Sequence, residues 1–129
     1  MQLKFDMLGI NCADMAASIR FYNMLGWPFS PPDDGGPYTE ITLDSGLRIS
    51  LNDLEMIKSM EPNWHAPVGH RMGIAFLCES PAEVDAVHDK MVAAGYASGK
   101  APWDAFWGQR YAQIVDPDGN LVDLFAWLA

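Results

Sequence analysis

The sequence predicts an α+β protein built from two tandem βαβββ modules, whose strands form a curved mixed sheet around a cleft. Three observations lead there: a strand followed by a helix occurs twice, each helix is expected to end at a glycine, and each half closes with a glycine-containing hairpin. The chain has 129 residues, 50% of them apolar, which suits one domain over residues 1–129. We expect modules at residues 1–53 and 70–129, with a connector at residues 54–69.

The first module begins with a strand over Leu3–Asn11, followed by a helix. Asp14 is a typical helix N-cap, and Gly26 is expected to end the helix. Between these residues, apolar side chains recur at helical spacing: Met15, Ile19, Tyr22 and Leu25. The proline-rich residues 27–34 predict a loop, after which we expect a short strand and a hairpin.

The second module repeats this order. Residues 71–78 read as a strand, and Ser80 with Glu83 forms a capping box that has Pro81 at the first helical position. Gly95 is expected to end this second helix, as Gly26 ends the first.

Two hairpins and a connector complete the prediction. Residues 38–51 contain a turn at Gly46, and residues 109–128 contain a turn at Gly119, each between apolar runs. A shift of 66 residues places Leu8–Cys12 on Ile74–Cys78, and a shift of 73 places Gly46 on Gly119. Within the connector, a helical turn is expected over residues 54–60.

Composition excludes several partners. The formal net charge is −9, with eight Lys and Arg residues scattered along the chain, so no basic surface for nucleic acid or anionic lipid is expected. Apolar runs are too short to cross a membrane, and the first residues lack a basic segment leading into an apolar one, so we expect a soluble protein that is not exported. Cys12 and Cys78 end apolar stretches, which suits buried reduced thiols and a cytoplasmic location.

The motifs resemble those of a known family. In the first half they are Ile10–Asp14, Phe21-Tyr22 and Leu25–Trp27; in the second half they are Trp107–Tyr111 and Asp116–Asn120. Together they resemble the vicinal oxygen chelate superfamily of glyoxalases, bleomycin resistance proteins and extradiol dioxygenases, in particular its bleomycin-resistance-like branch. The resemblance implies paired βαβββ modules, a ligand between them, and a homodimer.

The same resemblance locates the positions at which metal-dependent members hold their ion. Counting from Asp14 and the hairpin glycines places them at Met7, Ser50, Gly73 and Asp123. Only Asp123 supplies a good oxygen ligand for a divalent cation, so we expect no metal and no cofactor. A histidine such as His70 could restore a site only if a bulge changed the strand register.

A cleft without metal must bind by shape, aromatic stacking and a few hydrogen bonds. Trp103, Phe106 and Trp107 are expected to cluster in a loop, where each could stack on a ligand or simply pin the loop to the core. The predicted ligand-binding residues are Met7, Asn11, Arg48, Ser50, Gly73, Trp103, Trp107, Tyr111 and Asp123. No catalytic residue is assigned, because no nucleophile with a neighbouring base can be argued.

The leading functional hypothesis is a metal-free homodimer that binds a small aromatic or cationic molecule. One alternative is a metal-dependent lyase, isomerase or dioxygenase of the same superfamily, with Asp123 and a histidine as ligands. A second alternative is a regulatory or accessory module whose cleft is vestigial. Fold alone does not choose between them.

Overall fold

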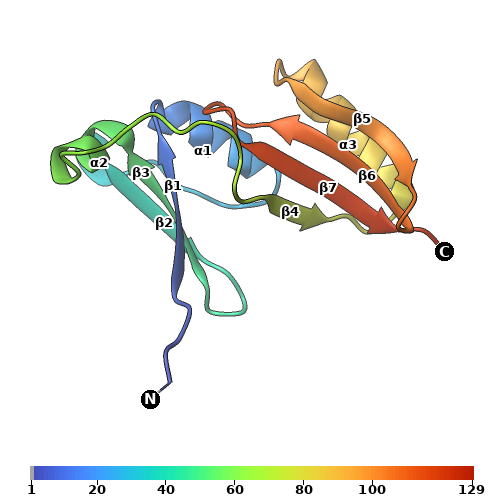
Figure 1. Ribbon diagram of the computed structural model, residues 1–129, viewed down its shortest axis with the longest axis horizontal. Helices are drawn as coiled ribbons and strands as arrows, with labels where there is room; N and C mark the ends of the chain where they lie inside the picture. The colour runs from blue at the N-terminus through green and yellow to red at the C-terminus, as the bar shows by residue number, and fades with distance from the viewer. Residues whose placement is uncertain (1) are drawn as a thin grey trace. The chain divides into compact units, whose positions relative to one another are not determined.

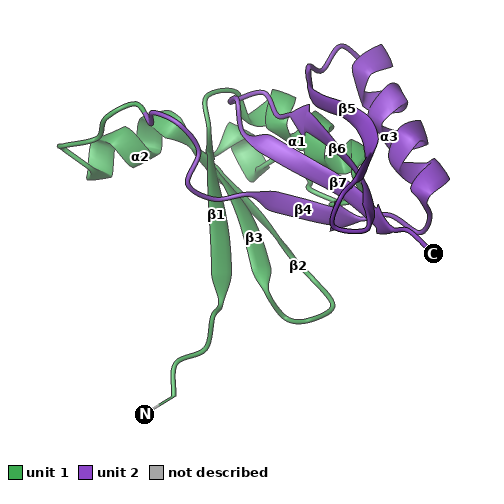
Figure 2. Cartoon of the chain, turned by 45° about the vertical axis from the view of Figure 1, so that its right-hand side comes forward, with its two compact units in different colours: residues 1–66 green, residues 67–129 purple. Residues whose placement is uncertain are grey.

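The computed structural model describes residues 2–129 and divides the chain into two compact units. Unit 1 comprises Met1–Ala66 and unit 2 comprises Pro67–Ala129 (Figure 2). Unit 1 contains a three-stranded sheet and unit 2 a four-stranded sheet, each combining parallel and antiparallel pairs. The predicted α+β class is therefore confirmed. Over the described residues, no helix combines the length and apolar character needed to span a membrane.

Unit 1 has the strand order β1-β3-β2, in which β3 pairs parallel with β1 and antiparallel with β2 (Figure 1). Its elements are β1 (Met7–Cys12), α1 (Met15–Met24), η1 (Asp33–Gly35), β2 (Tyr38–Thr42), β3 (Arg48–Asp53) and α2 (Leu54–Met60). The helical turn expected in the connector is thus present as α2. The first strand begins later than predicted, because residues 3–5 have no strand beside them and leave Leu3 and Phe5 exposed.

Helix α1 starts and ends as its sequence dictates. The side chain of Asp14 accepts a hydrogen bond from the amide of Ala17 at 3.1 Å, and Gly26 takes a φ of 95° just beyond the helix. The helix buries Ile19, Phe21 and Tyr22, and it packs against β3. This apolar contact forms the core of unit 1.

One element of the first module differs from the prediction. Residues 27–37 contain the short 3-10 turn η1 and no strand, so the described part of unit 1 forms three strands and not four. Pro28, Pro31 and Pro32 account for the difference, because proline has no N–H to donate to a neighbouring strand.

Unit 2 has the full βαβββ order. Its sheet runs β4-β7-β6-β5, with β4 parallel to β7 and the other pairs antiparallel. Its elements are β4 (Ile74–Leu77), α3 (Pro81–Ala93), β5 (Ser98–Ala105), β6 (Gln109–Val115) and β7 (Leu121–Trp127). Helix α3 packs against β5, β6 and β7, and Ser80 caps it by accepting from the amide of Glu83 at 3.2 Å.

Strand β5 corrects the prediction that Trp103 lies in a loop. Trp103 pairs with Tyr111 on β6, although Gly99 and Pro102 both disfavour a strand locally. The structure accommodates them because β5 lies at the edge of the sheet and its register shifts twice, before and after Lys100. These bulges absorb the residues that cannot pair regularly.

The strands of the two sheets pair in equivalent registers. Leu8 pairs with Ile49 in unit 1, and in unit 2 the residues reached by shifts of 66 and 73, Ile74 and Val122, also pair. Ile49 in turn pairs with Ile41, and Val122 pairs with Ile114, the residue 73 positions after Ile41. The internal repeat seen in the sequence is therefore a repeat of backbone pairing.

Candidate functional site

Each sheet has one face buried by its helix and one open face. In unit 1, alternation along the strands directs Ile10, Ile49 and Leu51 into the core, where they are at most 6% exposed. The open face carries the neighbouring positions, which the pairing groups as Met7 with Arg48, Gly9 with Ser50, and Asn11 with Asn52. All four predicted ligand residues of the first module, Met7, Asn11, Arg48 and Ser50, share this open face.

A chain of hydrogen bonds crosses the middle of this face. Buried Ser50 donates to Asn52 Oδ1 at 3.2 Å, and Asn52 Nδ2 donates to Asn11 Oδ1 at 3.2 Å. Gly9 leaves room for these hydrogen bonds, because a Cβ at this position would lie 2.9 Å from Asn52 Nδ2. The side-chain amides of Asn11 and Asn52 therefore form a polar surface that these side-chain hydrogen bonds hold in place.

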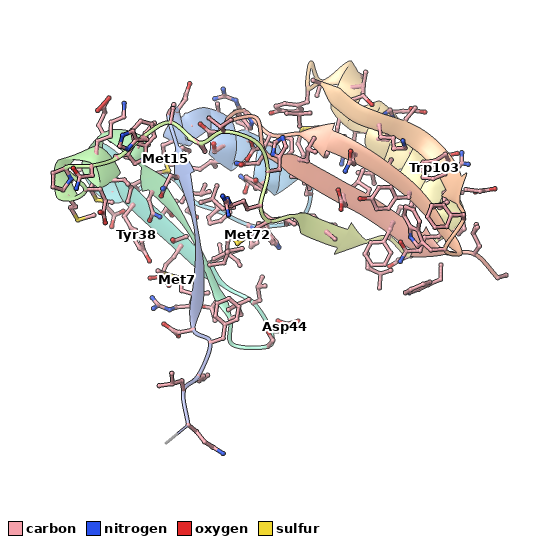
Figure 3. All side chains as sticks on the ribbon, in the orientation of Figure 1. Met7, Met15, Tyr38, Asp44, Met72 and Trp103 are labelled. Atoms are coloured by element: carbon pink, nitrogen blue, oxygen red, sulfur yellow. The ribbon has the colours of Figure 1, made fainter. Side chains whose placement is uncertain are left out.

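Arg48 organises the other end of the same face. Its guanidinium donates to Asp6 and to both carboxylate oxygens of Glu40, at 3.0 and 3.2 Å for the latter. The hydrogen bond from Arg48 lowers the pKa of Asp6, and Tyr38 donates to Glu40 at 3.2 Å. Met7 lies beside Tyr38, whose hydroxyl is 3.4 Å from the thioether sulfur (Figure 3). Arg48 is thus fully engaged by two carboxylates of its own unit.

The open face of unit 2 centres on Asp123. Gln113 Nε2 donates to Asp123 Oδ1 at 3.0 Å and contacts the Tyr111 hydroxyl at 3.4 Å. Burial, followed by the hydrogen bond to Asp123, raises the pKa of Tyr111 to about 12, so Tyr111 remains a neutral donor. A Cβ at Gly73 would lie 4.0 Å from Asp123 Oδ2, which places these two predicted residues side by side.

An aromatic corner, defined as Trp103, Phe106, Trp107 and Tyr111, borders this polar group. The Trp107 ring meets those of Trp103, Phe106 and Tyr111 edge to face, with centroids 5.5, 4.9 and 5.3 Å apart. Trp107 Nε1 donates to Gln109 at 2.6 Å, which fixes the indole. Trp107 is nevertheless 44% exposed and Phe106 91% exposed, so the corner offers aromatic surface to solvent. The structure thus brings all five predicted residues of the second module onto one face of unit 2.

The sequence did not single out Tyr38, Glu40 and Gln113, which lie among the polar residues of these open faces. A shift of 73 residues places Tyr38 on Tyr111 and Glu40 on Gln113. In both units the tyrosine hydroxyl lies within hydrogen-bonding distance of the residue two positions later, at 3.2 and 3.4 Å. Subtracting the repeat of 73 residues from Tyr111 identifies Tyr38 as its equivalent in unit 1.

The residues at the family's metal positions do not fit a divalent cation. Met7 and Gly73 offer a thioether and no side chain, Ser50 donates to Asn52, and only Asp123 carries a carboxylate. Within residues 2–129, no three His, Cys, Asp or Glu side chains gather closely enough to hold an ion. His88 contacts Ser98 at 2.7 Å on the helix-covered side and is not available to Asp123.

That the protein works without metal stays a prediction, which elemental analysis checks. We expect less than about 0.1 equivalent of Zn²⁺, Mn²⁺, Fe²⁺ or Ni²⁺ after incubation and desalting, because one carboxylate cannot replace the usual three protein ligands. Asp123→Ala is the matched control. Near-stoichiometric metal that disappears in this variant would contradict the prediction and favour the enzyme hypothesis.

The raised pKa of Tyr111 gives a pH-dependent prediction. Its folded pKa lies above the ordinary value of 10.0, so between about pH 10 and 12 the folded state holds more protons than the unfolded state. Stability should therefore fall as pH rises through this window. We expect Tyr111→Phe to flatten that part of the urea-midpoint profile. Asp123→Asn should lower the pKa of Tyr111 in an absorbance titration near 295 nm, and an unchanged titration would contradict the assigned contact.

A pocket of about 460 Å³ lies elsewhere in unit 2, between the segment Pro67–Met72 and the turn Asp118–Asn120. Its lining includes His70 and Arg71 but none of the predicted ligand residues. We therefore base the candidate site on the open face with its aromatic corner.

Comparison with known proteins agrees with this architecture. The sequence model of the Glyoxalase/Bleomycin resistance protein/Dioxygenase superfamily matches residues 4–124. The chain belongs to this superfamily, as its motifs predict. No functionally curated protein matches the sequence.

Solved structures show the same fold at low sequence identity. A glyoxalase/bleomycin resistance protein/dioxygenase from Nocardioides is 24% identical, with a TM-score of 0.75 over 99% of this chain and 85% of that one. A family enzyme from Burkholderia phytofirmans PsJN is 19% identical, with a TM-score of 0.80 over 98% and 100% of the two chains. A glyoxalase-related enzyme from Fulvimarina pelagi is 18% identical, with a TM-score of 0.80 over 97% and 88%.

Proposed function

We propose that this protein binds a small aromatic or cationic organic molecule, without metal, on the open face of unit 2. The observation that carries the proposal is the aromatic corner beside the Asp123 carboxylate. Aromatic rings attract flat and cationic groups, and a partly buried carboxylate adds attraction for a positive charge. The net charge of −9 acts in the same direction at long range.

The remaining predicted residues take supporting roles in this proposal. Gly73 leaves space beside Asp123, and Tyr111 orients the carboxylate through its hydroxyl. Asn11 and Arg48 provide a second polar surface on unit 1, where Met7 adds an exposed thioether and buried Ser50 supports the amide of Asn52. In this proposal residues 1–129 act as a single domain, with modules at 1–53 and 70–129 joined by the connector 54–69. The protein is a cytoplasmic homodimer, and light scattering would measure the mass of the dimer.

Equilibrium binding of benzyltrimethylammonium, with benzyl alcohol as its neutral counterpart, tests the proposal. We expect saturable calorimetric binding, weakened about thirtyfold by Trp107→Ala, because stacking and cation–π contacts each contribute about 1 kcal/mol. Trp64→Ala is the matched control, since Trp64 lies in unit 1 and packs under Lys58.

The outcomes distinguish the functional classes. Binding lost in Trp107→Ala but kept in Trp64→Ala supports the proposal. No saturable binding to the wild-type protein contradicts it. Lower stability of Trp107→Ala with an unchanged binding constant would instead assign the corner a packing role and favour an accessory module.

A further inference from the structure

The open face of unit 2 carries a charge order that the aromatic corner does not explain. Lys100, Gln113 and Asp123 lie in one row across three adjacent strands, because Lys100 pairs with Gln113 and Gln113 pairs with Asp123. Paired residues of neighbouring strands project from the same face. A cation therefore stands at one end of the row and an anion at the other.

The bulges of β5 create the positive end. The register shift after Lys100 places Lys100 and Trp103 on the same face, although an odd number of positions separates them. Lys100 Nζ lies 4.9 Å from the centroid of the Trp103 ring. Among the described residues no carboxylate forms an ion pair with this ammonium, so the ring face is its partner.

A second observation favours an acceptor at the same end. Trp103 Nε1 is buried and has no hydrogen-bond acceptor within the part of the chain that the structure describes. An unpaired buried N–H is costly, and an anionic oxygen of a ligand would satisfy it together with the Lys100 ammonium.

Gln113, in the middle of the row, is oriented in the same sense as the two charges. The Gln113 amide directs Nε2 toward Asp123 at 3.0 Å, while its Oε1 faces β5, where a Cβ at Gly99 would lie 3.5 Å away. The side-chain dipole thus continues the order from cation to anion. Adjacent strands are about 4.8 Å apart, so the row spans roughly 10 Å before side chains extend over it.

Building on the proposed function, we propose that the preferred ligand is an aromatic zwitterion of about the size of an aromatic amino acid. Its anionic group lies toward Lys100 and Trp103, its ammonium lies toward Asp123, and its ring packs on the aromatic corner. Lys100 is the residue that determines specificity, because it disfavours a simple cation at the Trp103 face.

Three probes with the same ring test this inference: phenylalanine, phenethylamine and 3-phenylpropanoate, titrated by calorimetry near pH 7. We expect wild type to bind the zwitterion tightest. Lys100→Met should weaken phenylalanine and strengthen phenethylamine by about fivefold each, the size of a partly exposed charge interaction. Asp123→Asn should shift preference in the opposite direction, toward 3-phenylpropanoate.

Lys58→Met is the control, because Lys58 lies over Trp64 at 4.7 Å and repeats the lysine–tryptophan contact in unit 1. It should leave all three binding constants unchanged. If the probes bind but Lys100→Met does not change the order of their affinities, this inference is overturned and the proposed function is not. No binding of any probe or of benzyltrimethylammonium to wild type overturns the proposed function, and this inference with it. Opposite shifts in two folded variants cannot come from a general loss of structure.

Discussion

Tyr22→Ala is expected to lower the free energy of unfolding by about 4 kcal/mol, in the range of large aromatic deletions from a packed core. Tyr22 is fully buried in unit 1. Its ring stacks on Trp27 with centroids 5.4 Å apart and meets Phe21 edge to face at 4.8 Å. Removing it opens a cavity that three aromatic neighbours line, because Phe29 also contacts the ring.

Urea unfolding followed by circular dichroism measures this effect. Tyr22→Phe keeps the ring and should retain most of the stability. Tyr38→Ala is the control, because Tyr38 lies on the open face and is 37% exposed. A loss of unfolding free energy below about 1.5 kcal/mol for Tyr22→Ala would be close to the average for point mutations in general. It would show that this aromatic cluster does not stabilise unit 1.

The second large effect is expected in the β6–β7 turn, where Asp116→Ala should cost about 2 to 3 kcal/mol. Asp116 is 4% exposed. Its carboxylate accepts from the amides of Asp118 and Asn120 at 2.9 and 2.8 Å, and from Asn120 Nδ2 at 2.8 Å. The alanine variant leaves these donors without their acceptor.

The hairpin of unit 1 supplies the control for this experiment. Leu43 occupies the position that corresponds to Asp116, and Gly46 donates to its carbonyl at 2.8 Å, just as Gly119 donates to that of Asp116 at 3.0 Å. Asp44→Ala changes an exposed carboxylate in that turn and should alter stability by less than about 0.5 kcal/mol. Equal losses for Asp44→Ala and Asp116→Ala in thermal unfolding would contradict the role given to the buried carboxylate.

Much of the fold could be predicted because its signals are local. Asp14 and Ser80 cap their helices through side chains three residues from the amides they bind, and Gly26, Gly46, Gly95 and Gly119 all adopt positive φ. Strand β5 could not be predicted in this way. Its pairing depends on β6 and on two bulges, whereas Gly99 and Pro102 locally indicate a loop.

The candidate site was predicted in its positions but not in its contacts. Asp123 and Gly73 followed from counting along the repeat, and the structure places them together. The partners of Asp123 and Arg48 could not be found by counting from a helix cap, because Gln113 and Glu40 reach them only across a strand pair. Cross-strand register decides such contacts, and it becomes visible only once the strands are assembled.

The shared register of the two sheets has a consequence for how this chain can change. The same pattern of strand pairing carries two different sets of side chains, and a substitution in one unit requires no matching substitution in the other. Ser50 and Asp123, like Glu40 and Gln113, already show this divergence at matched positions. A duplicated ancestor could thus keep one half with its charges paired, as Arg48 pairs with Asp6 and Glu40, while the other half acquired exposed aromatic surface.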